Sequence, residues 1–351
     1  MRMLKPQVPG VLESFPLLSE IKQEARKLKD LLAQSKSVLI SSTLTSDGDS
    51  IGAQIGMASI IRGISPSVQT WIVDESPVPE RYKFLKGTDK ILSISDWKAL
   101  KEKPSFDLGI TCDGGIERTG EVSPLFDSIT RTVLVDHHAI GSKKTYNSRL
   151  LDLEVSSTCE LVYLLHEYFG IEVLADLAEA LYIGIVFDTG FFKHSLTKPR
   201  THYVAARLIA TGIDFSRISD RAILERSWEA QLLLKAMVGN MTRELEGKVL
   251  ISHWSQSDLK QINFKDGDQE GMINQLYYTE FSQVVALITE KAKKDLKVSF
   301  RSKGQVNVAE LARSLDPEGG GHVRAAGCSL SLSIEEARSL IIEKITAVLR
   351  A

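Results

Sequence analysis

The 351-residue chain has only three cysteines, no long apolar run and almost no net charge, and each shortage excludes a class of protein. Cys112, Cys159 and Cys328 lie far apart and form no Cys-x-x-Cys pair, which disfavours a disulfide framework or a zinc knuckle. No stretch of about 18 apolar residues occurs, and the N-terminus lacks an apolar run of signal-peptide length. The net charge of -2 argues against a globally basic nucleic-acid-binding surface. We therefore expect a cytoplasmic protein without a membrane partner, in which any binding of an anionic ligand such as phosphate would be local.

Length and composition indicate a folded chain with more than one domain. Apolar residues make up 43% and charged residues 25% of the sequence, as in an average globular protein. A chain of this length has room for two domains of ordinary size. We predict a leader helix within residues 1–35, a catalytic domain at 36–198, a helical connector at 199–240 and a second domain at 241–351.

Short apolar runs alternate with helical stretches in the first half of the chain. Leu18 to Leu32 has apolar residues at helical spacing and predicts the leader helix. The predicted strands include Ser37–Ile40, Val68–Val73, Leu108–Ile110 and Thr132–Val135. Strands that are separated by helices favour a doubly wound, mainly parallel sheet. The expected fold class is therefore α/β.

The second half of the chain predicts a smaller α/β domain. Apolar runs at 249–252, 284–288 and 298–301 read as strands, and 333–349 reads as a closing helix. The segment from Pro199 to about Asn240 is rich in Ala, Leu and Arg at helical spacing, so we expect it to join the two domains.

Acidic and histidine residues follow the apolar runs of the first domain, where ordinary turn residues would be expected. The run that starts at Ser37 leads to Asp47 and Asp49, and later runs lead to Asp113, to Asp136-His137-His138 and, from the apolar stretch Ile183–Phe187, to Asp188. We take that last stretch as a strand as well. Because ligands bind outside the carboxyl ends of parallel strands, these side chains are expected to share one cleft.

Such a cluster of carboxylates and imidazoles predicts divalent metal ions. Buried carboxylates repel one another and lose hydration unless cations neutralise them. Oxygen ligands with a few imidazoles suit Mn²⁺, with Mg²⁺ and Co²⁺ as alternatives, and two ions about 3.5–4 Å apart can activate a water for attack on a phosphate ester. Each motif alone is more often a turn, a helix cap or a buried hydrogen-bonded pair. Their joint occurrence favours the metal site.

The second domain contains a glycine-rich loop and a basic segment. Gly319, Gly320 and Gly321 precede His322 and Arg324, and such a loop can bring backbone N–H groups close to an anion. Arg301 directly follows an apolar run, and its planar guanidinium suits phosphate. The basic segment consists of Lys291, Lys293, Lys294, Lys297, Arg301 and Lys303, for which an ordinary solvated surface is the alternative.

Taken together, these motifs resemble the DHH phosphoesterase family, in the branch that carries a DHH-associated C-terminal domain within the RecJ-like superfamily. The motifs are Thr45-Ser46-Asp47-Gly48-Asp49, Asp113, Asp136-His137-His138, Asp188-Thr189-Gly190 and Gly319-Gly320-Gly321-His322. The resemblance covers nearly the whole chain after the leader helix. It is strongest to nanoRNase/pAp-phosphatase type enzymes and to the catalytic portions of cyclic-dinucleotide phosphodiesterases.

The resemblance also implies roles for individual residues. It implies two Mn²⁺ ions, with Asp113 bridging them, Asp47 on one ion, and Asp49, His137 and Asp188 on the other. His138 would contact the scissile phosphate, and Asp136 would orient the two histidines. Across an interdomain cleft, Arg301 and the loop that contains His322 and Arg324 would bind the substrate. Ser157-Thr158 also resembles a family segment, although a helix N-cap is the better interpretation.

The first motif departs from the family pattern His-x-Asn-Pro-Asp-x-Asp. Thr43 stands in the position of the histidine, and Ser46 replaces the proline. A threonine cannot replace a neutral imidazole as a strong ligand, so the ion shared by Asp47 and Asp113 should bind more weakly. A working enzyme, an enzyme that needs high metal concentrations and a nucleotide-binding protein without turnover all remain open, and we favour the first two.

The leading functional prediction is hydrolysis of short single-stranded oligoribonucleotides or of 3'-phosphoadenosine-type nucleotides by a manganese-dependent phosphodiesterase or nucleotide phosphatase. One alternative is a catalytically weakened nucleotide sensor, because of Thr43. A second is a phosphodiesterase for cyclic or linear dinucleotides. Inorganic pyrophosphatase activity fits less well, because it would leave the glycine-rich loop without a role. A homodimer is compatible with the sequence, which does not decide the oligomeric state.

Overall fold

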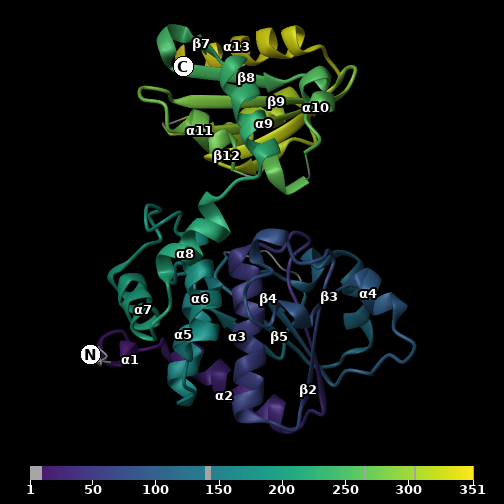
Figure 1. Ribbon diagram of the computed structural model, residues 1–351, viewed down its shortest axis with the longest axis vertical. Coiled ribbons are helices and arrows are strands. Elements are labelled where there is room, and N and C mark those ends of the chain that lie inside the picture. The colour runs from purple at the N-terminus through teal and green to yellow at the C-terminus, as the bar shows by residue number, and fades with distance from the viewer. Residues whose placement is uncertain (1–9, 139–143, 265, 270, 304–305, 351) are drawn as a thin grey trace. The chain divides into compact units, whose positions relative to one another are not determined.

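The computed structural model describes residues 10–138, 144–264, 266–269, 271–303 and 306–350 (Figure 1). The chain divides into two compact units, Met1–Glu225 and Arg226–Ala351. The division falls inside the segment 199–240 that was predicted to be a connector. The four-part domain scheme itself stays a prediction.

The first unit contains a six-stranded, fully parallel sheet with the strand order β3-β2-β1-β4-β5-β6. Its strands are β1 (Ser37–Ser41), β2 (Gln69–Asp74), β3 (Ile91–Ser93), β4 (Leu108–Cys112), β5 (Thr132–Asp136) and β6 (Ser148–Leu151). The predicted α/β fold class and all four of the strand runs named from the sequence up to Val135 are confirmed. The order reverses between β1 and β4, and ligands of such sheets bind at this switch point.

Helices cover both faces of this sheet. They are α1 (Val11–Ser14), α2 (Ser19–Ala33), α3 (Gly48–Ile64), α4 (Ile94–Ala99), α5 (Thr158–Phe169), α6 (Ala175–Asp188), α7 (Pro199–Ala210) and α8 (Phe215–Ser219). Short 3-10 or π turns occupy Glu80–Tyr82, Thr88–Lys90, Ile116–Arg118, Gly120–Ser128 and Asp220–Leu224. The predicted leader helix is α2, which buries Ile21, Ala25, Leu28 and Leu32 along one stripe. The sheet is therefore doubly wound.

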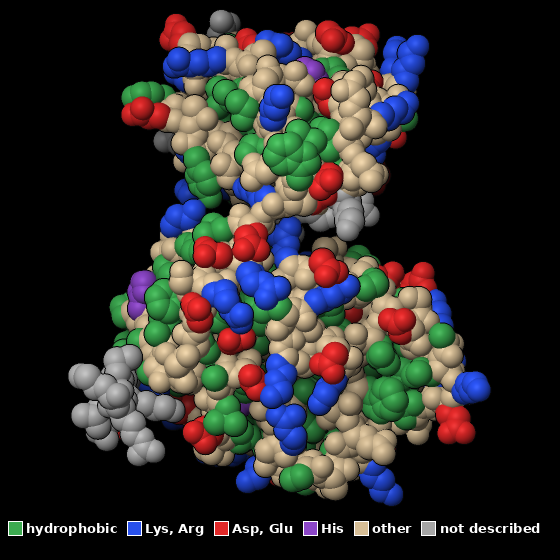
Figure 2. Space-filling model, in the orientation of Figure 1, with side chains coloured by type: hydrophobic (Ala, Val, Ile, Leu, Met, Phe, Trp, Pro, Cys, Tyr) green, Lys and Arg blue, Asp and Glu red, His purple; other side chains and the backbone are tan. Residues whose placement is uncertain are grey.

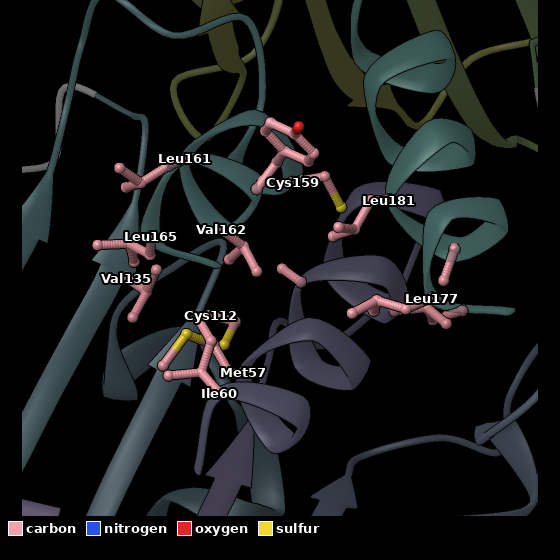
Figure 3. Packing of buried hydrophobic residues seen from close by; sticks show 14 of the residues in the cluster. Met57, Ile60, Cys112, Val135, Cys159, Leu161, Val162, Leu165, Leu177 and Leu181 are labelled. Atoms are coloured by element: carbon pink, nitrogen blue, oxygen red, sulfur yellow. The ribbon is translucent and has the colours of Figure 1, made fainter. Parts of the chain in front are cut away.

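Glycines on α3 allow it to pack closely on α5 and α6. A Cβ on Gly52 would lie 2.4 Å from the carbonyl oxygen of Ala180, and one on Gly56 would lie 2.5 Å from Val162 Cγ1. Figure 3 shows the resulting core, in which Met57 of α3 lies near Cys112 of β4. This packing fixes the first turn of α3 against the first turn of α5, where the site is built.

The stretch Ile183–Phe187 is not a strand, so that part of the sequence interpretation was wrong. It forms the last turns of α6, and Asp188 ends a helix instead of following a strand. The helix is buried on nearly all sides between residues 177 and 186, so it lacks the amphipathic period that marks a surface helix. A short apolar run of this kind cannot be told from a strand by periodicity alone.

The second unit contains a mixed six-stranded sheet with the order β11-β12-β10-β9-β8-β7, in which only β8 and β9 pair in parallel. The strands are β7 (Thr242–Glu244), β8 (Val249–Trp254), β9 (Val284–Ala292), β10 (Asp295–Ser302), β11 (Gly320–His322) and β12 (Ala325–Leu330). The helices are α9 (Trp228–Gly239), α10 (Gln256–Gln261), α11 (Ile273–Tyr277), α12 (Val308–Leu315) and α13 (Ile334–Arg350), with 3-10 turns at Leu245–Gly247 and Asp266–Gln269. The predicted strand runs and closing helix of this half are confirmed.

Helices cover the two faces of this second sheet unequally. Residues of α12 and α13 form one apolar cluster with β8, β9, β10 and β12. On the other face, α9, α10 and α11 pack on β8 and β9, and among the described residues no member of that cluster comes from β10, β11 or β12. Helix α11 also lies against part of β10, so the second face is open over β11, β12 and the rest of β10.

The described residues contain no membrane-spanning helix, and the visible face of each unit has no field of one charge sign. Within the described residues, no helix is long and apolar enough to cross a bilayer. Figure 2 shows lysines and arginines mixed with aspartates and glutamates over the visible face of each unit. Anion binding on this face would therefore depend on small groups of residues.

Candidate metal centre

The loop from β1 to α3 places two carboxylates at the start of a helix. Asp47 is the N-cap of α3, and its Oδ1 accepts hydrogen bonds from the N–H groups of Asp49 and Ser50, each at 3.0 Å. Capping satisfies N–H groups that a helix leaves unpaired. One oxygen of Asp47 thus caps the helix, and the half-buried carboxylate lies at the carboxyl end of the sheet.

Asp49 is fully buried and is held by the N-terminus of α5. Its Oδ2 accepts from the N–H of Thr158 at 2.7 Å, and its Oδ1 accepts from the N–H of Cys159 at 2.8 Å. The positive end of the helix dipole favours a carboxylate at this place. The contact joins two segments that are more than 100 residues apart in sequence.

Asp113 follows β4 with a left-handed backbone, at φ 60°. Its Oδ2 accepts from the hydroxyl of Ser50 at 2.8 Å, and its Oδ1 accepts from the hydroxyl of Thr158 at 3.0 Å. A positive φ is uncommon outside glycine and is tolerated best by Asp and Asn. The side chains from α3 and α5 therefore fix an unusual turn that aims this carboxylate at the cluster.

The two histidines follow β5 and are oriented by Asp136. The Oδ1 of Asp136 accepts from the backbone N–H groups of His137 at 2.7 Å and His138 at 3.1 Å, and it lies 2.9 Å from Nδ1 of His138. His137 is buried, whereas the His138 side chain is 44% exposed. The buried imidazole faces the carboxylates, and the other imidazole reaches solvent.

Ligand atoms gather in two overlapping groups around His137. Its Nε2 lies 2.9 Å from Asp188, 3.7 Å from Asp113 and 3.9 Å from Asp49. The first group consists of Asp49, His137 and Asp188, the second of Asp113, His137 and His138, and within each group the ligand atoms lie within 4.8 Å of one another. Asp47 belongs to neither group, but its charge acts on Asp113.

The electrostatics of the cluster fit a bound cation. Burial first, and then the charges of neighbouring carboxylates, raise the pKa of Asp47, Asp49 and Asp113. Burial alone lowers the pKa of His137, but Asp188 and the other nearby carboxylates outweigh it and raise this pKa to about 9. Both ring nitrogens of His137 are buried without a hydrogen bond that has good geometry. The residues present therefore fit a divalent metal ion, which would supply the positive charge that the cluster lacks.

The two departures from the family's first motif are accommodated locally. The Thr43 hydroxyl donates to the carbonyl of Thr45 at 3.3 Å, and its methyl group would lie 2.6 Å from a Cβ on Gly114. Ser46 donates to Asp74 at 2.8 Å. Thr43 is thus packed as a structural residue and offers no nitrogen ligand.

Asp74 is a buried carboxylate that the sequence interpretation missed. Besides Ser46, it accepts hydrogen bonds from the N–H of Ser42 at 3.2 Å and from Gln54 at 2.6 Å. Burial raises the pKa of Asp74 to about 6. Because it ends the predicted strand run Val68–Val73, the rule that selected Asp113 could have found it. It holds the loop that contains Asp47.

A second group that the sequence did not reveal supports the start of α5. Ser157 caps α5, which confirms the N-cap interpretation, and Glu160 in the first turn is fully buried. The carboxylate of Glu160 accepts from Ser156 Oγ at 2.6 Å, Thr201 Oγ1 at 2.8 Å and Arg200 Nε at 2.8 Å. This buried ion pair fixes the turn whose next residues hold Asp49 and Asp113.

Arg301 and His322, the two substrate-binding residues predicted in the second unit, lie in register on the open face of its sheet. Arg301 of β10 pairs with Ala325 of β12, and Ala325 pairs with His322 of β11. Paired residues on neighbouring strands point to the same side of a sheet. A small alanine thus separates a half-buried guanidinium from an exposed imidazole.

The glycines beside them have different structural requirements. A Cβ on Gly319 would lie 2.6 Å from the carbonyl oxygen of Ala312, and Gly321 has φ +139°. A Cβ on Gly320 would meet nothing within 4 Å. Gly319 and Gly321 are therefore needed by the backbone, whereas Gly320 leaves open space next to His322. Arg324 is exposed just before β12.

Comparison with known families divides the chain into the same two parts. Residues 37–185 match the DHH family, N-terminal domain, and residues 246–351 match the DHHA1 domain. Together these matches contain every predicted metal ligand except Asp188, which lies three residues beyond the first match, and every predicted substrate-binding residue.

Several curated proteins are similar over most of the chain. The bifunctional oligoribonuclease and PAP phosphatase NrnA of Thermus thermophilus is 24% identical over 96% of this chain and 95% of its own length. NrnA of Mycoplasma genitalium is 25% identical over 86% of this chain and 90% of its own length. The cyclic-di-AMP phosphodiesterase GdpP of Bacillus subtilis is 27% identical over 88% of this chain, but only 47% of that protein is covered.

Solved structures share the fold. An exopolyphosphatase-related protein from Bacteroides fragilis has a TM-score of 0.84 at 22% identity and covers 94% of this chain and 98% of its own. The exonuclease RecJ bound to manganese has a TM-score of 0.55 at 14% identity, with 97% and 96% covered. At these identities the likeness concerns the arrangement of the backbone alone.

Proposed function

Because the chain belongs to the DHH family and carries a DHHA1 domain, we propose that it is a metal-dependent phosphoesterase of short oligoribonucleotides and 3'-phosphoadenosine 5'-phosphate-type nucleotides. The observation that carries this proposal is the group formed by Asp49, His137 and Asp188, next to the doubly hydrogen-bonded Asp113. The NrnA relatives, which match this chain over nearly their whole length, have both activities in their name.

All five proposed metal ligands lie in the first unit. Asp113 would bridge two ions, with Asp47 on one and Asp49, His137 and Asp188 on the other. We propose Mn²⁺, with Mg²⁺ and Co²⁺ as alternatives, because the donor set is rich in oxygen with one imidazole and the RecJ structure contains manganese. When bound, the ions would supply positive charge to the phosphate and acidity to a coordinated water.

His138 is proposed to contact the scissile phosphate. Its Nδ1 lies 2.9 Å from Oδ1 of Asp136, and a carboxylate oxygen at this place favours the tautomer with the proton on Nδ1. The other ring nitrogen, Nε2, would then accept a proton, and in the protonated imidazolium it would donate to a phosphate oxygen; the side chain is 44% exposed, so a ligand can reach it. Asp136 is a positioning residue, because it holds both histidines and contacts no substrate in this assignment.

The open face of the second unit is proposed to bind the terminal phosphate or the neighbouring nucleotide. Arg301 offers a guanidinium fork, and His322 offers a second donor on the same side of the sheet. Gly320 lets a ligand approach the backbone closely, with Gly319 and Gly321 shaping the turn. Arg324 adds a positive charge at the rim.

Two alternatives to this proposal stay open, and Thr43 supports the first of them. A nucleotide sensor with little turnover remains the main one, since no nitrogen ligand stands at that position and the Thr43 hydroxyl is used by the backbone. A cyclic or linear dinucleotide phosphodiesterase is less favoured, because the GdpP relative is twice as long as the part that matches this chain.

The test is release of mononucleotides from a short 5'-labelled oligoribonucleotide with added Mn²⁺. We would compare the wild type with Asp113→Ala, Thr43→His and the surface control Asp89→Ala. The proposal predicts turnover by the wild type and by Asp89→Ala, and none by Asp113→Ala. A silent wild type that Thr43→His rescues would identify a nucleotide-binding protein without turnover. Silence in both, with metal bound, would exclude a phosphoesterase for these substrates.

A further inference from the structure

The open face of the second sheet continues beyond Arg301 into a pocket. On β10, Arg301, Ser299 and Lys297 alternate with the buried residues Phe300 and Val298, so all three side chains point to the open face. Lys297 pairs with Thr289 of β9, which therefore points the same way. Four residues along a strand span about 13 Å.

The pocket has a volume of about 580 Å³ and lies entirely within the second unit. Its lining includes Gln256, Lys260, Phe264, Thr289, Lys291 and Lys297. The residues come from α10, the segment after it, and strands β9 and β10. The pocket therefore lies between α10 and the sheet, at the end of the open face farthest from Arg301.

Positive charge dominates this pocket. Lys260, Lys291 and Lys297 are exposed, and none of them forms an ion pair with a described residue. The single lining carboxylate, Glu290, accepts the backbone N–H of Gln256 at 2.8 Å. Three ammonium groups against one carboxylate give the pocket a net positive charge beside a half-buried phenyl ring, which suits an anionic ligand with a flat face.

Small residues connect the pocket with Arg301 and His322. Ser299 pairs with Gly327 of β12, and Gly327 pairs with Gly320 of β11. These three paired residues form a row across β10, β12 and β11, between the rows that contain Arg301 and Lys297. None of the three has a large side chain. A chain of phosphates and bases can therefore lie along this row, beside α11, which lies against β9 and β10.

We propose that the pocket is a second nucleotide subsite, which binds a phosphate through Lys291 and Lys297 and a base through Phe264. The inference rests on the proposed function, because it extends the ligand that Arg301 and His322 hold. A strand longer than a dinucleotide reaches the pocket, whereas 3'-phosphoadenosine 5'-phosphate does not. Oligonucleotide length is therefore sensed by the second unit.

The experiment measures binding separately from turnover. Full-length Asp113→Ala protein, in EDTA, is titrated against a 5'-fluorescein-labelled adenylate pentamer, and unlabelled 3'-phosphoadenosine 5'-phosphate is used as a competitor. The test variant adds Lys291→Glu and Lys297→Glu. The matched control adds Lys293→Glu and Lys294→Glu, which make the same charge change in the same hairpin. The charge of Lys294 acts on Glu336 of α13, and α13 packs on the opposite face of the sheet. The control pair therefore changes charge away from the pocket.

We expect the test pair to weaken pentamer binding at least about tenfold and to leave the competitor's affinity unchanged. The slope of log affinity against log salt should fall by about 0.7 for each lost phosphate contact, as for single strands. Phe264→Leu, which keeps an apolar side chain but removes the ring, should weaken the pentamer several-fold. Equal losses in the test and control pairs, or equal losses for both ligands, would overturn the subsite.

Failure of this inference differs from failure of the proposed function. If the wild type with Mn²⁺ cuts dinucleotides while the lysine pair has no effect on the pentamer, the subsite is wrong and the enzyme stands. If the wild type cuts nothing but the lysine pair selectively weakens the pentamer, the subsite stands and the protein binds oligonucleotides without cutting them.

Discussion

The hydroxyl of Thr158 lies 3.0 Å from the carboxylate of Asp113 and ties the first turn of α5 to the strained turn after β4. The N–H of the same residue donates to Asp49 at 2.7 Å. One threonine therefore fixes the distance between two carboxylates of different segments, Asp49 in the first turn of α3 and Asp113 in the turn after β4. Preorganised ligands of this kind bind metal without having to be ordered first.

Thr158→Val should weaken Mn²⁺ binding about tenfold, because it removes one hydrogen bond to a charged group and keeps the backbone contact to Asp49. Calorimetric titration with Mn²⁺ measures this without any substrate. Thr111→Val is the matched control, since Thr111 is equally buried and its hydroxyl has no hydrogen-bond partner. Equal affinities for Thr158→Val and wild type would show that Ser50 alone suffices to hold Asp113.

Glu160→Gln tests whether the buried ion pair with Arg200 positions the site. The variant removes one of two carboxylate partners of Arg200, which keeps Asp152 at 3.5 Å, so we expect a loss of about 2 kcal/mol in the free energy of unfolding, measured in urea. Mn²⁺ affinity should fall as well, because the turn that Glu160 holds leads directly to Thr158. Glu167→Gln, at the other end of α5, is the control. It removes the charge that accepts from Val11 and Leu12. Metal affinity that falls equally in both variants would indicate general destabilisation instead of positioning.

Gly52→Ala should be strongly destabilising, although alanine is usually the better helix residue. Its Cβ would lie 2.4 Å from the carbonyl oxygen of Ala180, so α3 and α6 would have to separate. We expect a loss of more than about 2 kcal/mol, as for overpacked cores. Gly239→Ala, in α9 with nothing within 4 Å, should instead be neutral or slightly stabilising. Thermal unfolding followed by circular dichroism compares the two, and an unchanged Tm for Gly52→Ala would contradict the close packing.

The sequence predicted the parallel sheet because its strands are short apolar runs, each ending in polar residues. The same rule placed Asp113 and His137 at the carboxyl ends of strands, where the structure has them. The rule assigned the stretch Ile183–Phe187 before Asp188 to a strand, because a helix buried on nearly all sides shows no amphipathic period. The end of α6 nevertheless brings Asp188 to 2.9 Å from Nε2 of His137, and its role as a metal ligand stays a prediction.

The supporting residues could not be predicted in the same way. Glu160 and Arg200 are 40 residues apart, and each alone looks like an ordinary surface charge of a helix. Only the packing of α7 on α5 brings them together, and one sequence contains no signal for that contact. Asp74 differs, because it ends an apolar run as Asp113 does and was overlooked for lack of a neighbouring motif residue.

The buried carboxyl group of Asp74 should make the free energy of unfolding depend on pH. Its folded-state pKa of about 6 lies above the usual value of 3.8, so the folded protein holds this proton more tightly than the unfolded chain does. The stability gained from this proton is fully present below about pH 4 and is lost as the pH rises through about 6. Asp74→Asn is neutral at every pH and isolates the effect. The unfolding free energy of the wild type, relative to Asp74→Asn, should therefore fall by about 3 kcal/mol between pH 4 and pH 8, at about 1.4 kcal/mol per pKa unit. Urea unfolding at several pH values measures the difference. A difference that instead grows with pH would mean that the donors Ser42, Ser46 and Gln54 stabilise the ionised carboxylate more than burial penalises it.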